Sequence, residues 1–123
     1  MILEQLPKTE LVNYMTIPGL KLGKNLSNQQ VIDCVIDTVC TYFQVPKKLV
    51  LSKTRRKNVV RARHLCRWYI IKNTHMTLKE VGEIWGGADH TTILHSKNHV
   101  KEQINAKHPN EFKIYVQHLD KQL

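Results

Sequence analysis

Four polar side chains follow directly after a pair of glycines and carry the functional groups needed to bind base edges. They are Asp89, His90, Thr91 and Thr92. A carboxylate accepts a hydrogen bond from the exocyclic amine of cytosine, a threonine methyl packs on the methyl of thymine, and an imidazole donates or accepts at a base edge. Their position after a turn therefore suggests the start of a recognition helix, which enters the major groove N-terminus first.

The residues before these four predict the other half of a helix-turn-helix. Residues 77–85 fit a short amphipathic helix that opens on a Thr-x-x-Glu capping box, and Gly86-Gly87 then predicts a tight turn. Helix, glycine turn and helix is the layout of that motif. A purely structural interpretation remains open, in which Asp89 is an N-cap and Thr91 and Thr92 are ordinary first-turn residues.

The distribution of charge favours a nucleic-acid partner. The chain has 123 residues, 19 Lys+Arg against 10 Asp+Glu, and a formal net charge of +9. The segment from Thr38 to Lys79 has no acidic residue, and its basic residues are Lys47, Lys48, Lys53, Arg55, Arg56, Lys57, Arg61, Arg63, Arg67, Lys72 and Lys79. A local excess of this kind is typical of a polyanion-binding face. A basic helix can also lie on an anionic membrane, but no broad apolar face is left once the core positions are assigned, so we expect DNA rather than a membrane.

Length and composition predict one compact cytoplasmic domain. A hydrophobic content of 41% is enough for a single core. No apolar run approaches the roughly 20 residues needed to span a bilayer, and the N-terminus lacks the pattern of a signal peptide. Cys34, Cys40 and Cys66 have no Cys-x-x-Cys spacing, so we expect buried thiols rather than disulfides or a zinc ribbon.

The hydrophobic pattern is helical nearly throughout, which predicts an all-α domain over residues 27–123. Ser27-x-x-Gln30 is a capping box that opens one helix, and Pro46 predicts a short helical turn through Leu51. A basic loop over 52–58 then leads to a longer helix over about 59–72. Its expected core positions are Val59, Ala62, Cys66, Tyr69 and Ile70, which leaves Arg61, His64, Arg67 and Trp68 on other faces.

The two ends of the chain have weaker patterns. The second helix of the helix-turn-helix is expected to bury Ile93, Val100 and Ile104. Pro109 predicts the first turn of a last helix, whose apolar positions are Phe112, Tyr115, Val116, Leu119 and Leu123. Leu3, Leu6 and Leu11 suggest one short helix before Pro18-Gly19. We interpret residues 1–26 as an arm or linker, through which a protein partner could bind.

Three segments together resemble a known family. They are 52–64 (SKTRRKNVVRARH), 78–82 (LKEVG) and 86–95 (GGADHTTILH). They are similar to the C-terminal DNA-binding domain of the bacterial replication initiator DnaA, over roughly residues 27 to 122. The resemblance implies a compact helical domain like that of the Trp repressor and DnaA. It also implies monomeric binding to asymmetric, A/T-containing boxes such as TTATNCACA, in replication initiation or its regulation.

The resemblance also implies roles for individual residues. Arg55 would enter the minor groove, where a narrow A/T tract attracts arginine, and Asp89, His90 and Thr91 would contact bases in the major groove. Expected phosphate contacts are Lys53, Arg56, Lys57, Arg61, Arg63, Gly87, Thr92 and Lys97.

The sequence departs from the family pattern at two positions. Family members usually carry arginine where Ala88 stands, so one cation beside the recognition helix is missing. They also often carry proline at the position of Ala62. One good bidentate contact discriminates by about 1–3 kcal/mol, so the loss at Ala88 puts the preferred box in doubt. Arg56 and Lys57 could compensate nonspecifically.

No phosphate-loop motif Gly-x-x-x-x-Gly-Lys-[Ser/Thr] occurs in the 123 residues. We therefore expect this chain alone neither to bind ATP nor to melt an origin, and we expect no cofactor. It is either a fragment of a longer initiator or a self-contained protein, and the unmatched arm from Met1 favours the second. In that case it would be a regulator, including of transcription, or an accessory of a mobile element.

Two other classes of function were weighed. His95 and His99 are spaced i, i+4 with His90 nearby, a spacing that can surround zinc, but the Glu of His-Glu-x-x-His is missing, so we expect neither a hydrolase nor a metal site. An RNA-binding or interaction module is the other class. Aromatic residues make up 7% and look committed to helix cores, except for Trp68, which could be core, stack on a sugar or anchor a partner.

Overall fold

The computed structural model describes residues 26–123, which form six α-helices and no strand. The helices are α2 (Asn28–Phe43), α3 (Lys47–Val50), α4 (Lys57–Asn73), α5 (Leu78–Ile84), α6 (His90–Asn105) and α7 (Glu111–Gln122). The all-α prediction is confirmed. The short helix expected around Leu3 to Leu11 lies outside the described residues.

Local capping signals place the helix starts well. Ser27 with Gln30 and Thr77 with Glu80 both form the reciprocal capping boxes that the sequence predicts. Pro46 is the N-cap of α3, so the expected short helical turn is confirmed.

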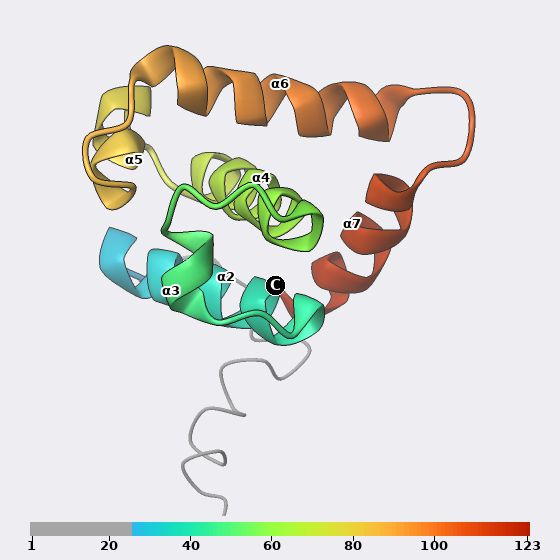
Figure 1. Ribbon diagram of the computed structural model, residues 1–123, viewed down its shortest axis with the longest axis horizontal. Coiled ribbons are helices and arrows are strands. Elements are labelled where there is room, and N and C mark those ends of the chain that lie inside the picture. The colour runs from blue at the N-terminus through green and yellow to red at the C-terminus, as the bar shows by residue number, and fades with distance from the viewer. Residues whose placement is uncertain (1–25) are drawn as a thin grey trace, which may run out of the picture.

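Helix α4 lies at the centre of the fold and packs against α2, α3, α5 and α6 (Figure 1). Its expected core residues are all buried, together with Leu65. Helix α6 runs along one side of the molecule, with α5 below its first turn and α7 folding back from its far end (Figure 1). One hydrophobic core thus joins α4 to its neighbouring helices and holds the position of α6 relative to the loop before α4.

Three expectations about helix positions need correction. Helix α4 begins at Lys57 with Arg56 as N-cap, so Lys57 and Asn58 belong to the helix rather than to the loop. Pro109 precedes the last helix, because the side chain of Asn110 accepts a hydrogen bond from the Lys113 N–H and caps α7. Arg67 is buried rather than on an outer face, since α5 and α6 both cover it.

Other positions follow the periodicity. Ile93 and Val100 of α6 are fully buried, and Ile104 of the same helix packs against the core while partly exposed. Within residues 26–123, no helix is long and apolar enough to cross a bilayer.

Candidate nucleic-acid interface

The turn between α5 and α6 is built on three glycines. Gly86 and Gly87 have φ angles of +72° and +86°, a region that costs side chains energy. The carbonyl of Gly82 accepts hydrogen bonds from the N–H groups of Gly87 and Ala88, both at 3.0 Å. The turn therefore closes onto α5, which sets the direction in which α6 begins.

The first residues of α6 present an exposed polar cluster. Asp89, His90, Thr91 and Thr92 are all exposed. Asp89 occupies the N-cap position, but its side chain makes no capping hydrogen bond to the backbone. Instead its carboxylate accepts from the Thr91 hydroxyl and lies 3.3 Å from His90 Nδ1. The Thr91 hydroxyl, more than any other neighbour, lowers the pKa of Asp89 and keeps it ionised. The Asp89 carboxylate is therefore held by the neighbouring His90 and Thr91 at the exposed start of α6.

The basic loop before α4 is held from below by Arg63. The Arg63 guanidinium donates to the backbone carbonyls of Val50 at 3.1 Å, Thr54 at 3.0 Å and Leu49 at 3.4 Å. The indole N–H of Trp85 donates to the same Val50 carbonyl at 2.9 Å. Arg63 of α4 thus holds both the end of α3 and the loop, and Trp85 ties the end of α3 to the end of α5.

This placement gives Arg63 a different task from the phosphate contact expected from the sequence. Arg63 is only 9% exposed, and its guanidinium donates to carbonyls of α3 and of the loop. The neighbouring basic residues Lys53, Arg55, Arg56 and Lys57 are exposed. Arg63 therefore positions the loop whose cations reach the solvent.

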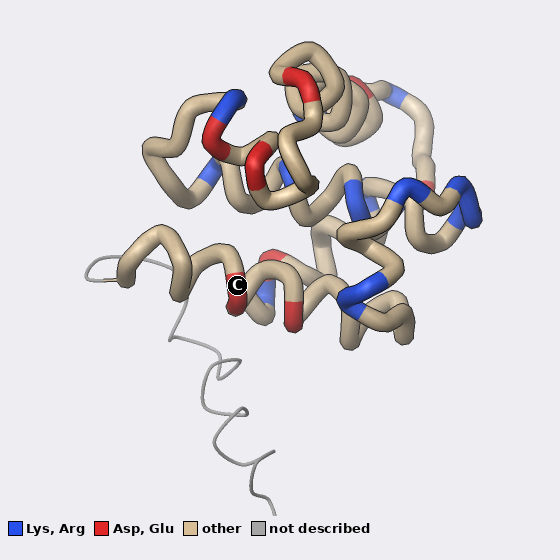
Figure 2. Tube along the Cα trace, turned by 60° about the vertical axis from the view of Figure 1, so that its left-hand side comes forward, with Lys and Arg blue, Asp and Glu red and all other residues tan. Residues whose placement is uncertain are grey.

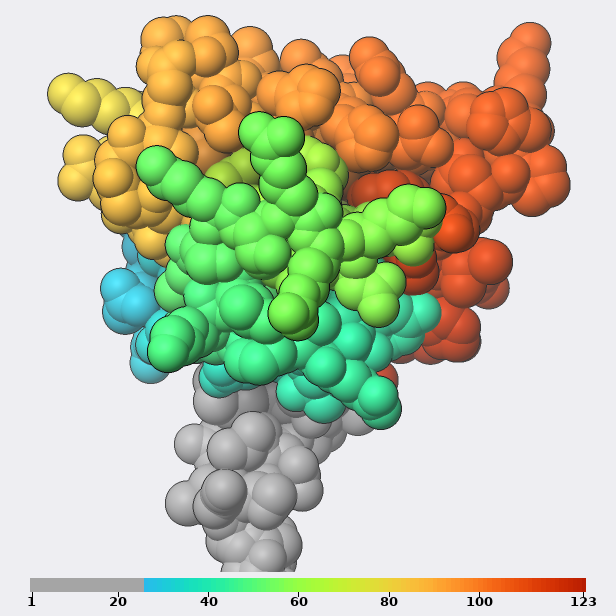
Figure 3. All heavy atoms as spheres, in the orientation of Figure 1, coloured from blue at the N-terminus to red at the C-terminus, as the bar shows by residue number. Residues whose placement is uncertain are grey.

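A hollow of about 540 Å³ lies between the basic loop and the start of α6. Figure 3 shows side chains of the loop and of α4 standing out beneath α6 on one face. Figure 2 shows several blue Lys and Arg segments at one end of the molecule, while others lie elsewhere along the chain. The structure thus brings together residues far apart in sequence. The hollow is lined by Leu51, Ser52, Lys53, Arg55, Arg63, Arg67, Trp85, Gly87, Ala88, Asp89 and Thr92.

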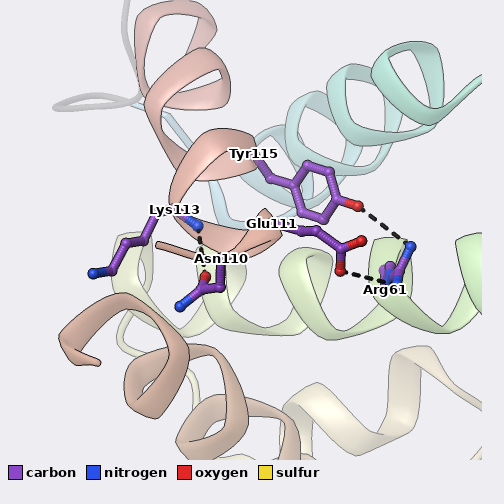
Figure 4. A network of polar contacts seen from close by, with 5 residues as sticks. All are labelled: Arg61, Asn110, Glu111, Lys113 and Tyr115. Atoms are coloured by element: carbon purple, nitrogen blue, oxygen red, sulfur yellow. Dashed lines mark hydrogen bonds and ion pairs between the residues drawn. The ribbon is translucent and has the colours of Figure 1, made fainter. Parts of the chain in front are cut away.

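Four of the eight expected phosphate contacts do not line this hollow: Arg56, Lys57, Arg61 and Lys97. Arg61 forms an ion pair with Glu111 at 2.9 Å and donates to the Tyr115 hydroxyl at 3.5 Å, so it joins α4 to α7 (Figure 4). Lys97 is half-buried and lines a second hollow of about 520 Å³ together with Trp68, Ile71, Lys72, Lys101, Ile104 and Asn105. There the ammonium of Lys72 lies 4.7 Å from the Trp68 ring.

A buried polar contact beneath α6 was missed at the sequence level. The Ser96 hydroxyl accepts a hydrogen bond from Arg67 at 2.9 Å and shares another with His64 Nδ1 at 2.8 Å. Burial, followed by the nearby His99 and Arg67, lowers the pKa of His64 to about 4. Ser96 lies three residues after Ile93 and four before Val100, so the helical spacing could have revealed it.

The histidine rings on this side lie close together without forming a metal site. The centroids of His64 and His99 are 5.0 Å apart, and those of His95 and His99 are 6.1 Å apart. Among residues 26–123, no three His, Cys, Asp or Glu side chains are grouped in a way that could hold a metal ion.

Comparison with known proteins agrees with this geometry. The family model described as "Bacterial dnaA protein helix-turn-helix" matches residues 32–100, which is more than half of the chain. The chain belongs to this family. The matched residues include α3, α4 and α5 together with the basic loop, the glycine turn and the first two-thirds of α6. The described residues are therefore a DnaA-type helix-turn-helix domain, which is a DNA-binding domain.

Individual relatives of the chain are replication initiators named DnaA. The chromosomal replication initiator protein DnaA of Flavobacterium psychrophilum is 32% identical over 103 residues, which cover 84% of this chain and 21% of that protein. The protein of that name from Thermomicrobium roseum is 27% identical over 106 residues, covering 85% of this chain and 23% of that protein. The chain thus spans less than a quarter of the length of these curated relatives.

Both departures from the family pattern fall at informative places in this DnaA-type domain. Ala62, where proline is usual, is fully buried in the core, so a small side chain fits there. Ala88 is half-buried and lines the hollow, where it adds a methyl group and no charge. Cationic groups at that end of the hollow must therefore come from other residues.

Proposed function

We propose that this DnaA-type domain binds duplex DNA at an asymmetric, A/T-containing box of the initiator kind, in connection with replication initiation or its regulation. The observation that supports this most directly is the shared hollow between the basic loop and the start of α6. A loop cation and a recognition helix that flank one hollow can engage adjacent grooves of the same duplex. The relatives named as replication initiators support the link to initiation.

Base recognition is assigned to the exposed side chains at the two edges of the hollow. Asp89, His90 and Thr91 would contact bases in the major groove, because they are exposed at the N-terminal start of α6. Arg55 would enter the adjacent minor groove. The Asp89 carboxylate is held ionised, which suits it to accept from a cytosine amine.

Phosphate contacts are assigned to the remaining exposed groups. Lys53 on the loop, the backbone at Gly87 and Thr92 on α6 line the hollow. Arg56 and Lys57 are exposed at the start of α4, where the loop ends. Lys97 lies two turns farther along α6 and Arg61 lies at the α7 side, so we assign both to flanking phosphates. Arg63 is proposed as a positioning residue, since its donors hold the loop.

The test is selection of bound duplexes from a random DNA pool at physiological salt, followed by titration of the enriched duplex against a scrambled one. Enrichment of a box resembling TTATNCACA supports the proposal. A different sharp motif would instead indicate a diverged regulator or a mobile-element protein with its own site. Binding without enrichment would contradict sequence-specific recognition.

A pair of variants adds a sharper test of the recognition helix. His90→Ala should flatten the sequence preference and leave nonspecific binding largely intact, because base contacts specify rather than attract. Asn98→Ala, at an exposed position farther along the same helix, is the matched control. Full selectivity in His90→Ala would contradict the assignment of α6.

We further propose that the domain acts by binding rather than by catalysis, and that it does so at the nucleoid. Its membership of a family of DNA-binding domains supports both points.

We also propose that residues 1–26 serve as an arm that binds a protein partner. Pull-down with residues 1–26 deleted, compared with the full chain, tests the arm. Identical capture by both forms would contradict it.

A further inference from the structure

Arg67 stands out among the residues that line the hollow. It is only 6% exposed, yet none of its donors is paired with a carboxylate of residues 26–123. One terminal nitrogen donates to the Ser96 hydroxyl at 2.9 Å, and the guanidinium lies 4.7 Å from the centre of the Trp85 ring. Its Nε is buried and has no hydrogen-bond partner within residues 26–123.

A buried charge of this kind is expensive unless something compensates it. Removing an ion from water costs several kcal/mol even after relaxation, and an orphaned donor adds to that cost. Burial lowers the pKa of Arg67 to about 10, which still leaves the guanidinium charged at neutral pH. The protein therefore keeps a cation in a place where an apolar side chain of the same length would be cheaper.

The acidic residue that shares the hollow does not supply the counter-charge. Asp89 lies on the rim and directs its carboxylate to the Thr91 hydroxyl and the His90 ring. Arg63, the other buried guanidinium in the wall, is committed to loop carbonyls and is itself a cation. The described part of the chain thus leaves Arg67 without an anion.

We propose that the hollow holds one phosphodiester group of the DNA backbone and that Arg67 is its principal cationic partner at the base of the hollow. This inference rests on the proposed function, and names one contact within it. The anion supplies the counter-charge that Arg67 lacks within residues 26–123 and accepts from the part of the guanidinium that lines the hollow.

Other features of the hollow suit a phosphate. Lys53 and Arg55 stand at its edge, and the N-terminal end of the 16-residue helix α6 opens beside it. The first N–H groups of a helix lack intrahelical partners and carry partial positive charge, so they favour an anion. Trp85 and Ala88 form an apolar wall, which keeps water from screening the contact.

Arg67 also supplies positive charge close to Ala88, where the usual arginine is missing. A methyl group at position 88 leaves the hollow open above the guanidinium instead of filling it. We infer that in this chain the cation beside the recognition helix is supplied from below, by α4, rather than from the turn itself.

The test combines Arg67→Met with single uncharged phosphates. Met has nearly the length of Arg without its charge. Wild-type protein and the variant are titrated against the selected duplex and against duplexes that each carry one methylphosphonate. At one backbone position the wild type should lose about tenfold in affinity, as expected for a hydrogen bond to a charged group. Arg67→Met should lose a similar factor on the unmodified duplex and nothing further at that position.

A salt titration and a control variant separate this role from a structural one. The slope of log affinity against log salt should become shallower by about 0.9 in Arg67→Met. Ser96→Ala removes the anchor of Arg67 but not its charge, so it should change thermal stability while leaving the slope unchanged. An unchanged slope in Arg67→Met, together with the same methylphosphonate sensitivity as the wild type, would overturn the inference.

Two further outcomes are also decisive. If Arg67→Met does not fold, the Nε–H resonance of Arg67 in the wild type is followed by NMR during addition of the selected duplex, and a resonance that does not move would overturn the inference. If the wild type binds no duplex at all, the proposed function fails and this contact fails with it. Loss of the Arg67 effect alone, with selective binding intact, leaves the proposed function standing.

Discussion

Gly82 allows the turn before the recognition helix to pass against α5, and Gly82→Ala tests that close approach. A Cβ built on Gly82 would lie 2.2 Å from the backbone oxygen of Ala88 and 3.3 Å from its carbonyl carbon. Contacts below 3.0 Å are essentially never seen for real Cβ atoms, so the turn would have to move by about 0.8 Å, taking 3.0 − 2.2 Å. The same turn is also held by hydrogen bonds from Gly87 and Ala88 to the Gly82 carbonyl.

The magnitude follows from two opposing effects. Overpacking costs about 1–3 kcal/mol, and a backbone obstacle places this case at about 3 kcal/mol. Alanine is favoured over glycine in a helix by about 1 kcal/mol. The net loss of unfolding free energy is therefore about 2 kcal/mol, or a drop in Tm of about 8–16 °C for a domain of this size.

The assay is thermal and urea unfolding of Gly82→Ala beside Glu83→Ala, followed by DNA titration. Glu83 is exposed and adjacent on α5, so its variant controls for the gain in helix propensity. DNA selectivity should fall in Gly82→Ala even below its Tm, because the start of α6 is displaced. A Gly82→Ala variant as stable as the Glu83→Ala control would refute the reasoning about this close approach.

Three other predictions concern the core and its margins. The pKa of His64 is lowered from 6.5 to about 4, so the neutral ring is favoured in the folded state. The stability that this provides is fully present above pH 6.5 and is lost as the pH falls towards 4. The upper limit is about 3.4 kcal/mol, from a pKa lowered by about 2.5 at about 1.36 kcal/mol for each pH unit. Partial exposure of the ring reduces this to about 1–2 kcal/mol, and His64→Gln should flatten the pH dependence in urea unfolding. Trp85→Phe removes the indole donor to the Val50 carbonyl and should cost about 1–2 kcal/mol in the same assay, whereas no loss would contradict a structural role for that bond. Glu111→Gln breaks the ion pair with Arg61, and the Glu111 side chain is 59% exposed. The loss of unfolding free energy should therefore stay below about 1 kcal/mol and shrink at high salt. A larger loss that does not depend on salt would contradict this interpretation.

Signals that act within a few residues were read correctly from the sequence. The capping boxes at Ser27 and Thr77 were correct because each is a reciprocal bond over three residues. The five predicted core positions of α4 were correct because helical periodicity identifies the centre of a buried stripe, although it missed the buried Arg63, Leu65 and Arg67. Pro109 was the local failure, since proline and the following Asn110 both suit a helix start and the side-chain cap decided between them.

The candidate site could be predicted only in part. Its exposed members at the start of α6 and in the basic loop follow from motif and charge. Arg63 and Arg67 were assigned to outer positions because the sequence shows their charge but not the loop carbonyls and the hydroxyl that bind them. Ser96 was missed because a polar residue on a buried face is recognised only by its partners.

The sequence by itself determined that this chain is helical, basic over one segment and equipped with a glycine turn before polar residues. Those properties depend on neighbours along the chain and on composition. Only the tertiary structure decided that the basic loop and the start of α6 flank one hollow, and that a guanidinium lies buried at its base without a counter-charge from the described part of the chain. Packing α4 between α2, α5 and α6 brings distant residues together, and burial then changes the energetic cost of every charge that is enclosed.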